Sequence, residues 1–262
     1  MIKEYYPGTN LLHQQGEVDT DNKKCGIWTT FYKSGIISSY TSYKKDVKHG
    51  IKAEYTESGD ISLIAYYKDD MENGYCTVYY DQSAGYTIKK SHGLLVNGKM
   101  EGEWNHYTAK NILKSKNMYA NNKLHGKQFS YYENGNLHEE FSCINDMKDG
   151  RYRTYDEDGN LHIDTNYVKD KLHGNYKEYD NGYLIEEGEL VNNSRVSKWL
   201  TYYQNGQISS KVHYKNSILS GMFMTYYDNG QVNIIGHYKN NVKIGEWSYY
   251  NNNGKLQKKV KY

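Results

Sequence analysis

The feature that most constrains this chain is a repeat of about 24 residues, in which an aromatic residue stands five positions after each repeat start. We number each start as position 0 of its repeat. Successive starts are separated by 24, 24, 28, 24, 24, 24, 23, 24 and 24 residues. The starts are Gly26, Gly50, Gly74, Gly102, Gly126, Gly150, Gly174, Ser197, Gly221 and Gly245. A constant period in this range is typical of repeat proteins, whose units stack on one another to bury their apolar faces.

The residues at position 5 form a column that every repeat occupies, called here the aromatic column. Its members are Phe31, Tyr55, Tyr79, Tyr107, Tyr131, Tyr155, Tyr179, Tyr202, Tyr226 and Tyr250. Disordered segments are poor in aromatic residues, whereas this chain is 15% aromatic with regular spacing. The repeats continue from residue 26 to residue 262 without a linker, which predicts one domain over 26–262. We interpret residues 1–25 as a degraded N-terminal capping repeat.

Each repeat reads as one β-hairpin. The repeat from Gly126 begins GKQFSYYENGNLHEEFSCI, and its Asn134-Gly135 pair favours a two-residue type I′ turn. Apolar residues recur at positions 11, 13, 15 and 17, the alternation of a half-buried antiparallel strand. Glycines at the equivalent place predict turns at Gly35, Gly59, Gly135, Gly159, Gly182, Gly206, Gly230 and Gly254. The sequence therefore predicts an all-β fold, an elongated array of about ten antiparallel hairpins in a single twisted meander sheet.

Two repeats depart from the common length. The repeat from Gly74 has four extra residues, near 82–84 and 91–92, and the repeat from Gly174 lacks one residue at 180–182. Loops absorb such changes in repeat proteins.

The turn type sets which residues share a face. A two-residue turn pairs position 6 with 11, position 2 with 15 and position 0 with 17, so the tryptophans at position 2 and the tyrosines at position 6 join the apolar face. The aromatic column is then expected on the opposite, more polar face. There the rings either brace cross-strand neighbours or form a flat recognition surface for a protein partner, and the two roles are compatible.

Charge is distributed unevenly along the chain. The net charge of +2 gives no indication of nucleic-acid binding. Residues 239–262 nevertheless hold six lysines and one glutamate, a net charge of +5. Lys255, Lys259 and Lys261 are the candidate basic contacts of this end, for an acidic protein or an anionic membrane surface. Their alternative role is to deter edge-to-edge aggregation.

The motifs for chemistry are incomplete. Residues 93–100 have the G-x-x-x-x-G-K core of a phosphate-binding loop, but Met100 stands where Ser or Thr would reach magnesium. Asp156-Glu157-Asp158-Gly159 begins like a calcium loop, yet it lies on a predicted turn and lacks the closing glutamate. We expect no catalytic residues, no cofactor, no metal and three free cysteines.

These strings resemble the MORN-repeat variant, a divergent form of the membrane occupation and recognition nexus repeat found in bacterial YwqK-type antitoxins. The resemblance covers about nine-tenths of the chain and is carried by GEWSYYNNNGKL from Gly245, GKQFSYYENGNL from Gly126 and KWLTYYQNGQI from Lys198. It implies a hairpin array without enzymatic activity that acts in protein interaction or neutralises a toxin.

The function expected from the sequence is non-enzymatic binding of a protein partner, as an antitoxin-like or immunity-like binder or as a scaffold. Lipid-headgroup binding through the basic C-terminal repeats is one alternative. Carbohydrate binding is another, because cell-wall-binding repeats also alternate Trp, Tyr-Tyr and Asn-Gly. The N-terminus lacks an apolar signal segment, which favours the cytoplasm. The oligomeric state stays open.

Overall fold

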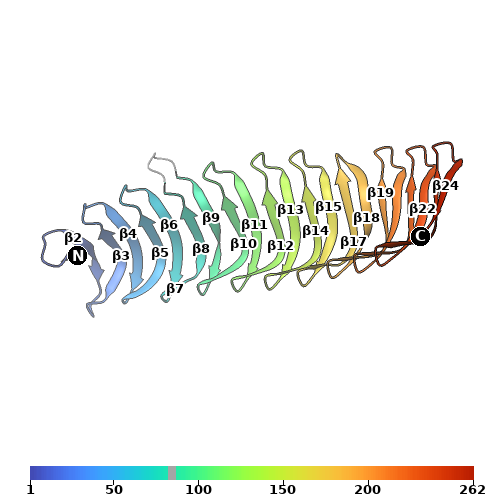
Figure 1. Cartoon of the computed structure of the whole chain (residues 1–262). Coiled ribbons are helices and arrows are strands. Elements are labelled where there is room, and N and C mark those ends of the chain that lie inside the picture. The colour runs from blue at the N-terminus through green and yellow to red at the C-terminus, as the bar shows by residue number, and fades with distance from the viewer. Residues whose placement is uncertain (82–86) are drawn as a thin grey trace. The chain divides into compact units, whose positions relative to one another are not determined.

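The computed structural model describes residues 1–81 and 87–262, and all regular secondary structure in them is β-strand (Figure 1). The chain forms two compact units, Met1–Gly135 and Asn136–Tyr262. The strands of the first unit are β1 (Ile2–Tyr5), β2 (Leu12–Val18), β3 (Lys24–Phe31), β4 (Ile37–Lys44), β5 (Val47–Tyr55), β6 (Ile61–Lys68), β7 (Met71–Glu72), β8 (Gly74–Tyr79), β9 (Lys89–Val96), β10 (Lys99–Tyr107), β11 (Leu113–Ala120) and β12 (Lys123–Tyr131). Those of the second unit are β13 (Leu137–Ile144), β14 (Met147–Tyr155), β15 (Leu161–Val168), β16 (Lys171–Leu172), β17 (Gly174–Asp180), β18 (Tyr183–Val191), β19 (Ser194–Tyr202), β20 (Ile208–Lys215), β21 (Ile218–Tyr226), β22 (Val232–Lys239), β23 (Val242–Tyr250) and β24 (Leu256–Lys261).

Within each unit, consecutive strands pair antiparallel as a meander of hairpins. This confirms the predicted all-β hairpin array. β7 and β8 both pair with β6, and β16 and β17 both pair with β15. In the predicted cap, β1 pairs with β2, and β2 pairs with β3 of the first full repeat. That residues 26–262 form a single domain remains a prediction.

The turns at the predicted glycines have a different geometry from the predicted one. In the first full repeat, Gly35 donates its N–H to the carbonyl of Tyr32 (2.9 Å), and Tyr32 donates to Ile36 (2.8 Å). Only the glycine has a positive φ (85°), so this is a three-residue loop in which glycine forms a bulge. The two-residue type I′ prediction is therefore wrong for most repeats, including the Asn-Gly turns at Gly135, Gly206, Gly230 and Gly254, whose asparagines have no positive φ.

The repeat that lacks one residue has the two-residue turn. Asn181 and Gly182 both have positive φ (48° and 81°), and the flanking Asp180 and Tyr183 are paired. A type I′ turn needs one residue fewer than the glycine-bulge loop, which explains the 23-residue spacing. The extra residues predicted near 82–84 lie outside the described residues, whereas Ser91 and His92 lie within β9.

Type I′ turns instead recur at the other ends of the hairpins, where each repeat passes to the next. Lys45 and Asp46 both have positive φ (54° and 68°). Asp46 also links two repeats, because its N–H donates to the carbonyl of Lys24 (3.0 Å) and its carboxylate accepts the N–H of Lys24 (2.7 Å). The same two-way link is made by Asp70, Asn122, Asp170, Asn193, Ser217 and Asn241.

A β-bulge beside each hairpin turn changes the predicted faces. The predicted pairings of positions 0 with 17 and 2 with 15 are observed, but Phe31 at position 5 pairs with Ile37 at position 11. The hydroxyl of Thr30 lies 2.7 Å from the hydroxyls of both Ser38 and Ser39, so these two consecutive residues face the same side. The same arrangement recurs in the eighth repeat. The residue at position 11 therefore lies on the opposite side of the sheet from positions 13, 15 and 17, on the same side as the aromatic column.

We call the two sides the tryptophan face, which carries Trp28, Trp104, Trp199 and Trp247, and the tyrosine face, which carries the aromatic column. The four tryptophans are only 1–5% exposed. Each lies on a glycine of the preceding strand, where any Cβ atom would overlap the indole ring. These glycines are Gly16, Gly93, Gly188 and Gly236. The absence of a side chain thus creates the space that each ring fills.

Three tryptophans bond a carbonyl, namely Trp28, Trp104 and Trp199, and three lie under a cation, namely Trp28, Trp199 and Trp247. Trp28 donates its Nε1–H to the carbonyl of Glu17 (2.8 Å), the residue after the glycine. Lys24 lies 4.1 Å from the Trp28 ring centroid, and Arg195 lies 3.9 Å from that of Trp199. Such contacts stabilise by about 0.5–2 kcal/mol and cover the outer face of the ring that they contact.

The tyrosines at position 6 do not pack with the tryptophans as expected. The hydroxyls of four of them, Tyr32, Tyr80, Tyr203 and Tyr227, reach the next hairpin along the sheet and donate to the carbonyl of its position-5 residue. Tyr32 bonds Tyr55 (2.6 Å) and Tyr203 bonds Tyr226 (2.6 Å). These bonds add a tether between neighbouring repeats at the turn end.

The glycine sites predict a strong coupling between a glycine and its tryptophan. Gly188 has no left-handed φ, so Gly188→Ala should cost about 1–3 kcal/mol solely through overpacking against Trp199. In a Trp199→Leu background the same change should cost less than about 0.5 kcal/mol. Urea unfolding of the four proteins measures the coupling, and additive costs would contradict this account.

The repeat start predicts a stabilising substitution. Ser197 holds a left-handed conformation (φ 60°) where the other nine starts have glycine. Ser197→Gly should therefore stabilise the chain by about 1 kcal/mol. Gly102→Ser, at φ 67° with no neighbouring atom within 4 Å, should destabilise it by about as much. Thermal unfolding of both variants tests this. A change of the melting temperature in the same direction in both would contradict a preference for glycine at the left-handed start.

Candidate binding face

The structure places every residue of the aromatic column on the tyrosine face, and all ten side chains are partly buried. The rings of Tyr55 and Tyr40 meet edge to face, with centroids 5.8 Å apart. Tyr155 donates its hydroxyl to Glu140 (2.8 Å), and Tyr202 donates to Glu187 (2.6 Å). The column thus does brace its cross-strand neighbours, and it leaves ring surface uncovered.

Two of the column tyrosines, Tyr155 and Tyr202, keep their protons at neutral pH. Burial and the hydrogen bond to Glu187 raise the pKa of Tyr202 to about 12. Burial, with the hydrogen bond to Glu140, also raises the pKa of Tyr155 above its usual value. These phenols therefore act as hydrogen-bond donors and not as general bases.

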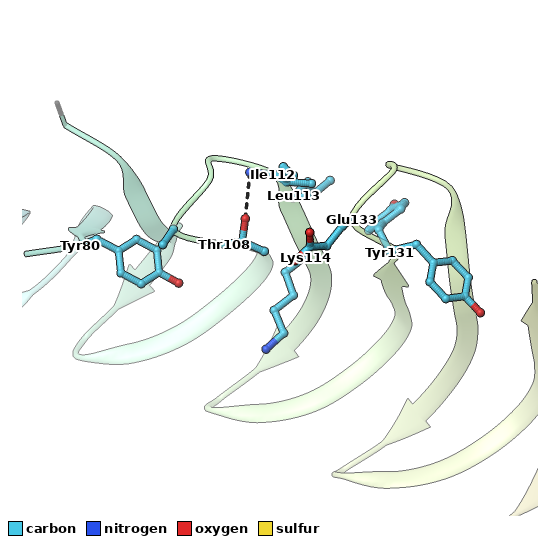
Figure 2. Close-up of a pocket in the computed structure, with 9 residues that line it drawn as sticks. Tyr80, Thr108, Ile112, Leu113, Lys114, Tyr131 and Glu133 are labelled. Atoms are coloured by element: carbon cyan, nitrogen blue, oxygen red, sulfur yellow. Dashed lines mark hydrogen bonds between the residues drawn. The ribbon is translucent and has the colours of Figure 1, made fainter. Parts of the chain in front are cut away.

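Grooves lie between successive hairpins, where position 11 of one repeat faces the column residue of the next. Figure 2 shows one such groove, with Leu113 and Lys114 between the rings of Tyr80 and Tyr131. Its volume is about 410 Å³. A second, of about 280 Å³, is bordered by Val232 and Tyr250 in the second unit. The bulge produces these grooves, since it is the bulge that moves position 11 to the tyrosine face.

Beside the column, one residue from each strand aligns with its neighbours in a row across the strands, called here the central row. Positions 3 and 14 of each repeat contribute to it. In the first unit the paired residues are Lys3, Gln15, Thr29, Tyr40, Ala53, Ile64, Thr77, His92, Asn105, Lys116 and Phe129. From Gln15 to Asn105 these described residues carry no formal charge, because burial and Lys89 lower the pKa of His92 below its usual value.

The central row of the second unit is ionic over its first half. It consists of Glu140, Arg153, Asp164, Lys177, Glu187, Leu200, Lys211, Met224, Ile235, Ser248 and Lys259. Arg153 contacts Glu140 (3.0 Å), and Arg151 donates two hydrogen bonds to Asp164 (2.6 and 2.9 Å). The two units therefore present different chemistry at the same repeat positions.

The predicted basic contacts are partly neutralised. Lys259 lies in the central row and forms an ion pair with Glu246 (2.5 Å), which raises the pKa of the lysine. Lys261 is paired across the strands with the same glutamate residue. Lys255 follows the last described turn, where its N–H bonds the side chain of Asn251 (2.8 Å). The three lysines are thus not gathered into one pocket.

Within the described parts of the chain, no three His, Cys, Asp or Glu side chains are placed to hold a metal ion. The three cysteines are free, and burial raises the pKa of Cys76 to about 11. The described residues hold no helix that could span a lipid bilayer.

Six segments of this chain match the MORN repeat variant. They are 24–45, 124–143, 148–169, 195–216, 219–240 and 243–262. Each begins two residues before a repeat start, and three of them begin at a cation that covers a tryptophan ring, namely Lys24, Arg195 and Lys243. The hairpins from Gly50, Gly74, Gly102 and Gly174 lie outside these MORN-variant segments but have the same strand pairing.

No curated protein matches the chain. Solved structures with similar regions include the TcdB2–TccC3–Cdc42 structure, at 11% identity and a TM-score of 0.18 over 96% of this chain and 14% of that one. Another is the Tc holotoxin pore of Photorhabdus luminescens, at 12% identity and a TM-score of 0.21 over 96% of this chain and 17% of that one. The chain spans less than one fifth of either, and similarity at this level supports no inference about function.

Sequence reasoning identified the column but missed the central row. The row depends on which residues face each other across every strand pair, and the bulges alter that register twice in each repeat. The glycine beneath each tryptophan did leave a signal, since a glycine stands 11 or 12 residues before all four tryptophans.

The ionic part of the central row predicts a pH-dependent contribution to stability. The hydrogen bonds from Arg151 lower the pKa of Asp164 below its ordinary 3.8, so the pair stabilises above that value and is lost as pH falls through the lowered pKa. Asp164→Asn should therefore cost about 1 kcal/mol near neutral pH, discounted because Arg151 is more than half exposed, and clearly less near pH 2. Urea midpoints at the two pH values test this, and an equal cost at both would contradict it.

Proposed function

We propose that this chain is a non-enzymatic binding module that holds a protein partner against its tyrosine face. The observation that carries the proposal is the contrast between the two faces. Tryptophan rings are buried on one side, three of them under cations, whereas partly exposed tyrosines and the grooves beside them line the other. Tyrosine offers a large contact area for little entropy loss, and it is enriched at protein interfaces.

The fold suits an extended partner. Successive column residues lie two strands apart, or about 9–10 Å. A partner that crosses several hairpins would meet one ring and one groove in each repeat. Such a surface collects many modest contacts and does not need one deep pocket.

We propose further that the chain neutralises its partner or holds it in a complex, and does not convert it chemically. The MORN-variant segments favour a binding or scaffold role, and the resemblance to YwqK-type antitoxins suggests a toxin or another effector protein as the partner. Lipid headgroups are a weaker candidate, because Glu246 already compensates Lys259.

The groove in Figure 2 gives a test of partner binding. The partner is first recovered on the immobilised chain and identified by mass spectrometry, and its affinity is then measured with purified variants. Tyr131→Ser should weaken binding at least about tenfold, whereas Tyr131→Phe keeps the ring and should bind within about twofold of wild type.

Tyr119→Ser is the matched control for this experiment. It removes an equally large, partly buried ring next to the core of the tryptophan face, and it should lower stability without changing partner affinity. Equal losses of affinity for Tyr131→Ser and Tyr119→Ser would show that only stability matters. Unchanged affinity in Tyr131→Ser would exclude this part of the tyrosine face.

A further inference from the structure

From the tyrosine face of the first unit we infer a site of self-association, at which a second copy of this chain packs face to face on β3–β9. Two parallel rows define the surface. The first is the part of the central row formed by Thr29, Tyr40, Ala53, Ile64, Thr77 and His92. The second, called here the flanking row, consists of Ile27, Ser42, Ile51, Tyr66, Tyr75 and Leu94.

No residue of these two rows carries a formal charge, although the chain as a whole is 24% charged. Large side chains of the flanking row are open to solvent, with Ile27 59%, Tyr66 45% and Tyr75 60% exposed. In the same strands the charged residues Lys52 and Glu54 pair with each other on the tryptophan face. The central row beside the flanking row is partly to fully buried, so the exposed apolar side chains of the flanking row are what mark an interaction site.

The absence of charge favours a second copy as the occupant. A face that meets itself across a two-fold axis brings the side chains near the axis next to their own equivalents, so a charge there would meet a like charge. This surface avoids that repulsion. The ionic central row of the second unit offers oriented charges to a foreign partner, whereas the uncharged rows offer none.

The spacing of the flanking row is compatible with two-fold symmetry. Ile27, Ile51 and Tyr75 occupy position 1 of three successive repeats, so they lie about 9–10 Å apart with Ile51 in the middle. A two-fold axis parallel to the strands and through Ile51 sets Ile51 against its own copy and Ile27 against the copy's Tyr75. The contact between Ile27 and Tyr75 is then made twice, once on each side of the axis.

A hollow beside Tyr75 can receive the opposing isoleucine. It has a volume of about 520 Å³ and is lined by Ile64, Tyr66, Gly74, Tyr75, Thr77 and His92. Tyr75 stacks on His92 with the ring planes 9° apart, and Thr77 bonds His92 (2.8 Å), so this wall of the hollow is held in place. Ile27 of one copy fits over the hollow of the other, and the reverse contact completes the pair.

The area of the surface indicates a reversible dimer. Six strands at about 4.8 Å by five residues at about 3.4 Å give about 500 Å² for each copy. Two copies would bury about 1,000 Å² in total, at the lower limit for a specific interface. Self-association in the micromolar range is therefore expected.

Sedimentation of the purified full chain between about 1 and 200 µM tests the inference, and it should show a concentration-dependent monomer–dimer equilibrium. Ile51→Arg places two unpaired charges on the axis and should raise the dissociation constant at least about a hundredfold. Met222→Arg is the matched control, since Met222 also occupies position 1 and is 36% exposed, against 38% for Ile51. It should leave the equilibrium unchanged.

Charge pairing tests the geometry itself. Ile27→Arg and Tyr75→Glu should each weaken the dimer. The double variant should regain at least about tenfold of the lost affinity, because the introduced guanidinium of one copy would face the introduced carboxylate of the other only across the axis. Monomer at every concentration, equal effects of Ile51→Arg and Met222→Arg, or no recovery in the double variant would overturn the inference. These measurements use the chain alone, so their failure would leave the proposed partner binding intact.

Discussion

The β-bulge beside each hairpin turn is the constraint on which the rest of the structure depends. It lets Thr30 contact both Ser38 and Ser39, and it thereby moves the aliphatic residue at position 11 to the other side of the sheet. Without the bulge, the aliphatic residues at position 11 would lie on the tryptophan face, together with the tryptophans. The aromatic column would then have only polar residues across from it on the paired strand. With the bulge, one side buries the tryptophans on glycines, and the other has grooves between hairpins, such as those beside Leu113 and Val232.

The period and the glycine turns were sufficient to predict the strands, their antiparallel pairing and the face of the aromatic column. The turn type was not predictable from the Asn-Gly pair. In both geometries the glycine has positive φ, and the difference lies in the asparagine, which is left-handed at Asn181 but not at Asn134 or Asn205. Loop length decided it, because the 23-residue repeat is the one that closes with two residues.

The candidate face was predictable only in part for a related reason. The column follows from counting residues, whereas the central row follows from pairing, and each repeat shifts register once beside the turn and once at its left-handed start. An alternation pattern read along one strand cannot reveal that Tyr40, Ala53 and Ile64 are neighbours. The change from uncharged to ionic chemistry between the two units became visible only after these rows were assembled.

The division of roles among repeat positions explains how one fold carries two surfaces. Three features hold the hairpins together. The repeat starts have left-handed backbone, the turns between repeats make hydrogen bonds in both directions, and each tryptophan packs on a glycine. Positions 3 and 14 contribute none of these, so they vary from Ala53 and Ile64 to Arg153 and Asp164 while the strand pairing stays the same. A surface that varies while the strand pairing stays the same is free to be shaped by what it binds, which directs the search for function to the tyrosine face.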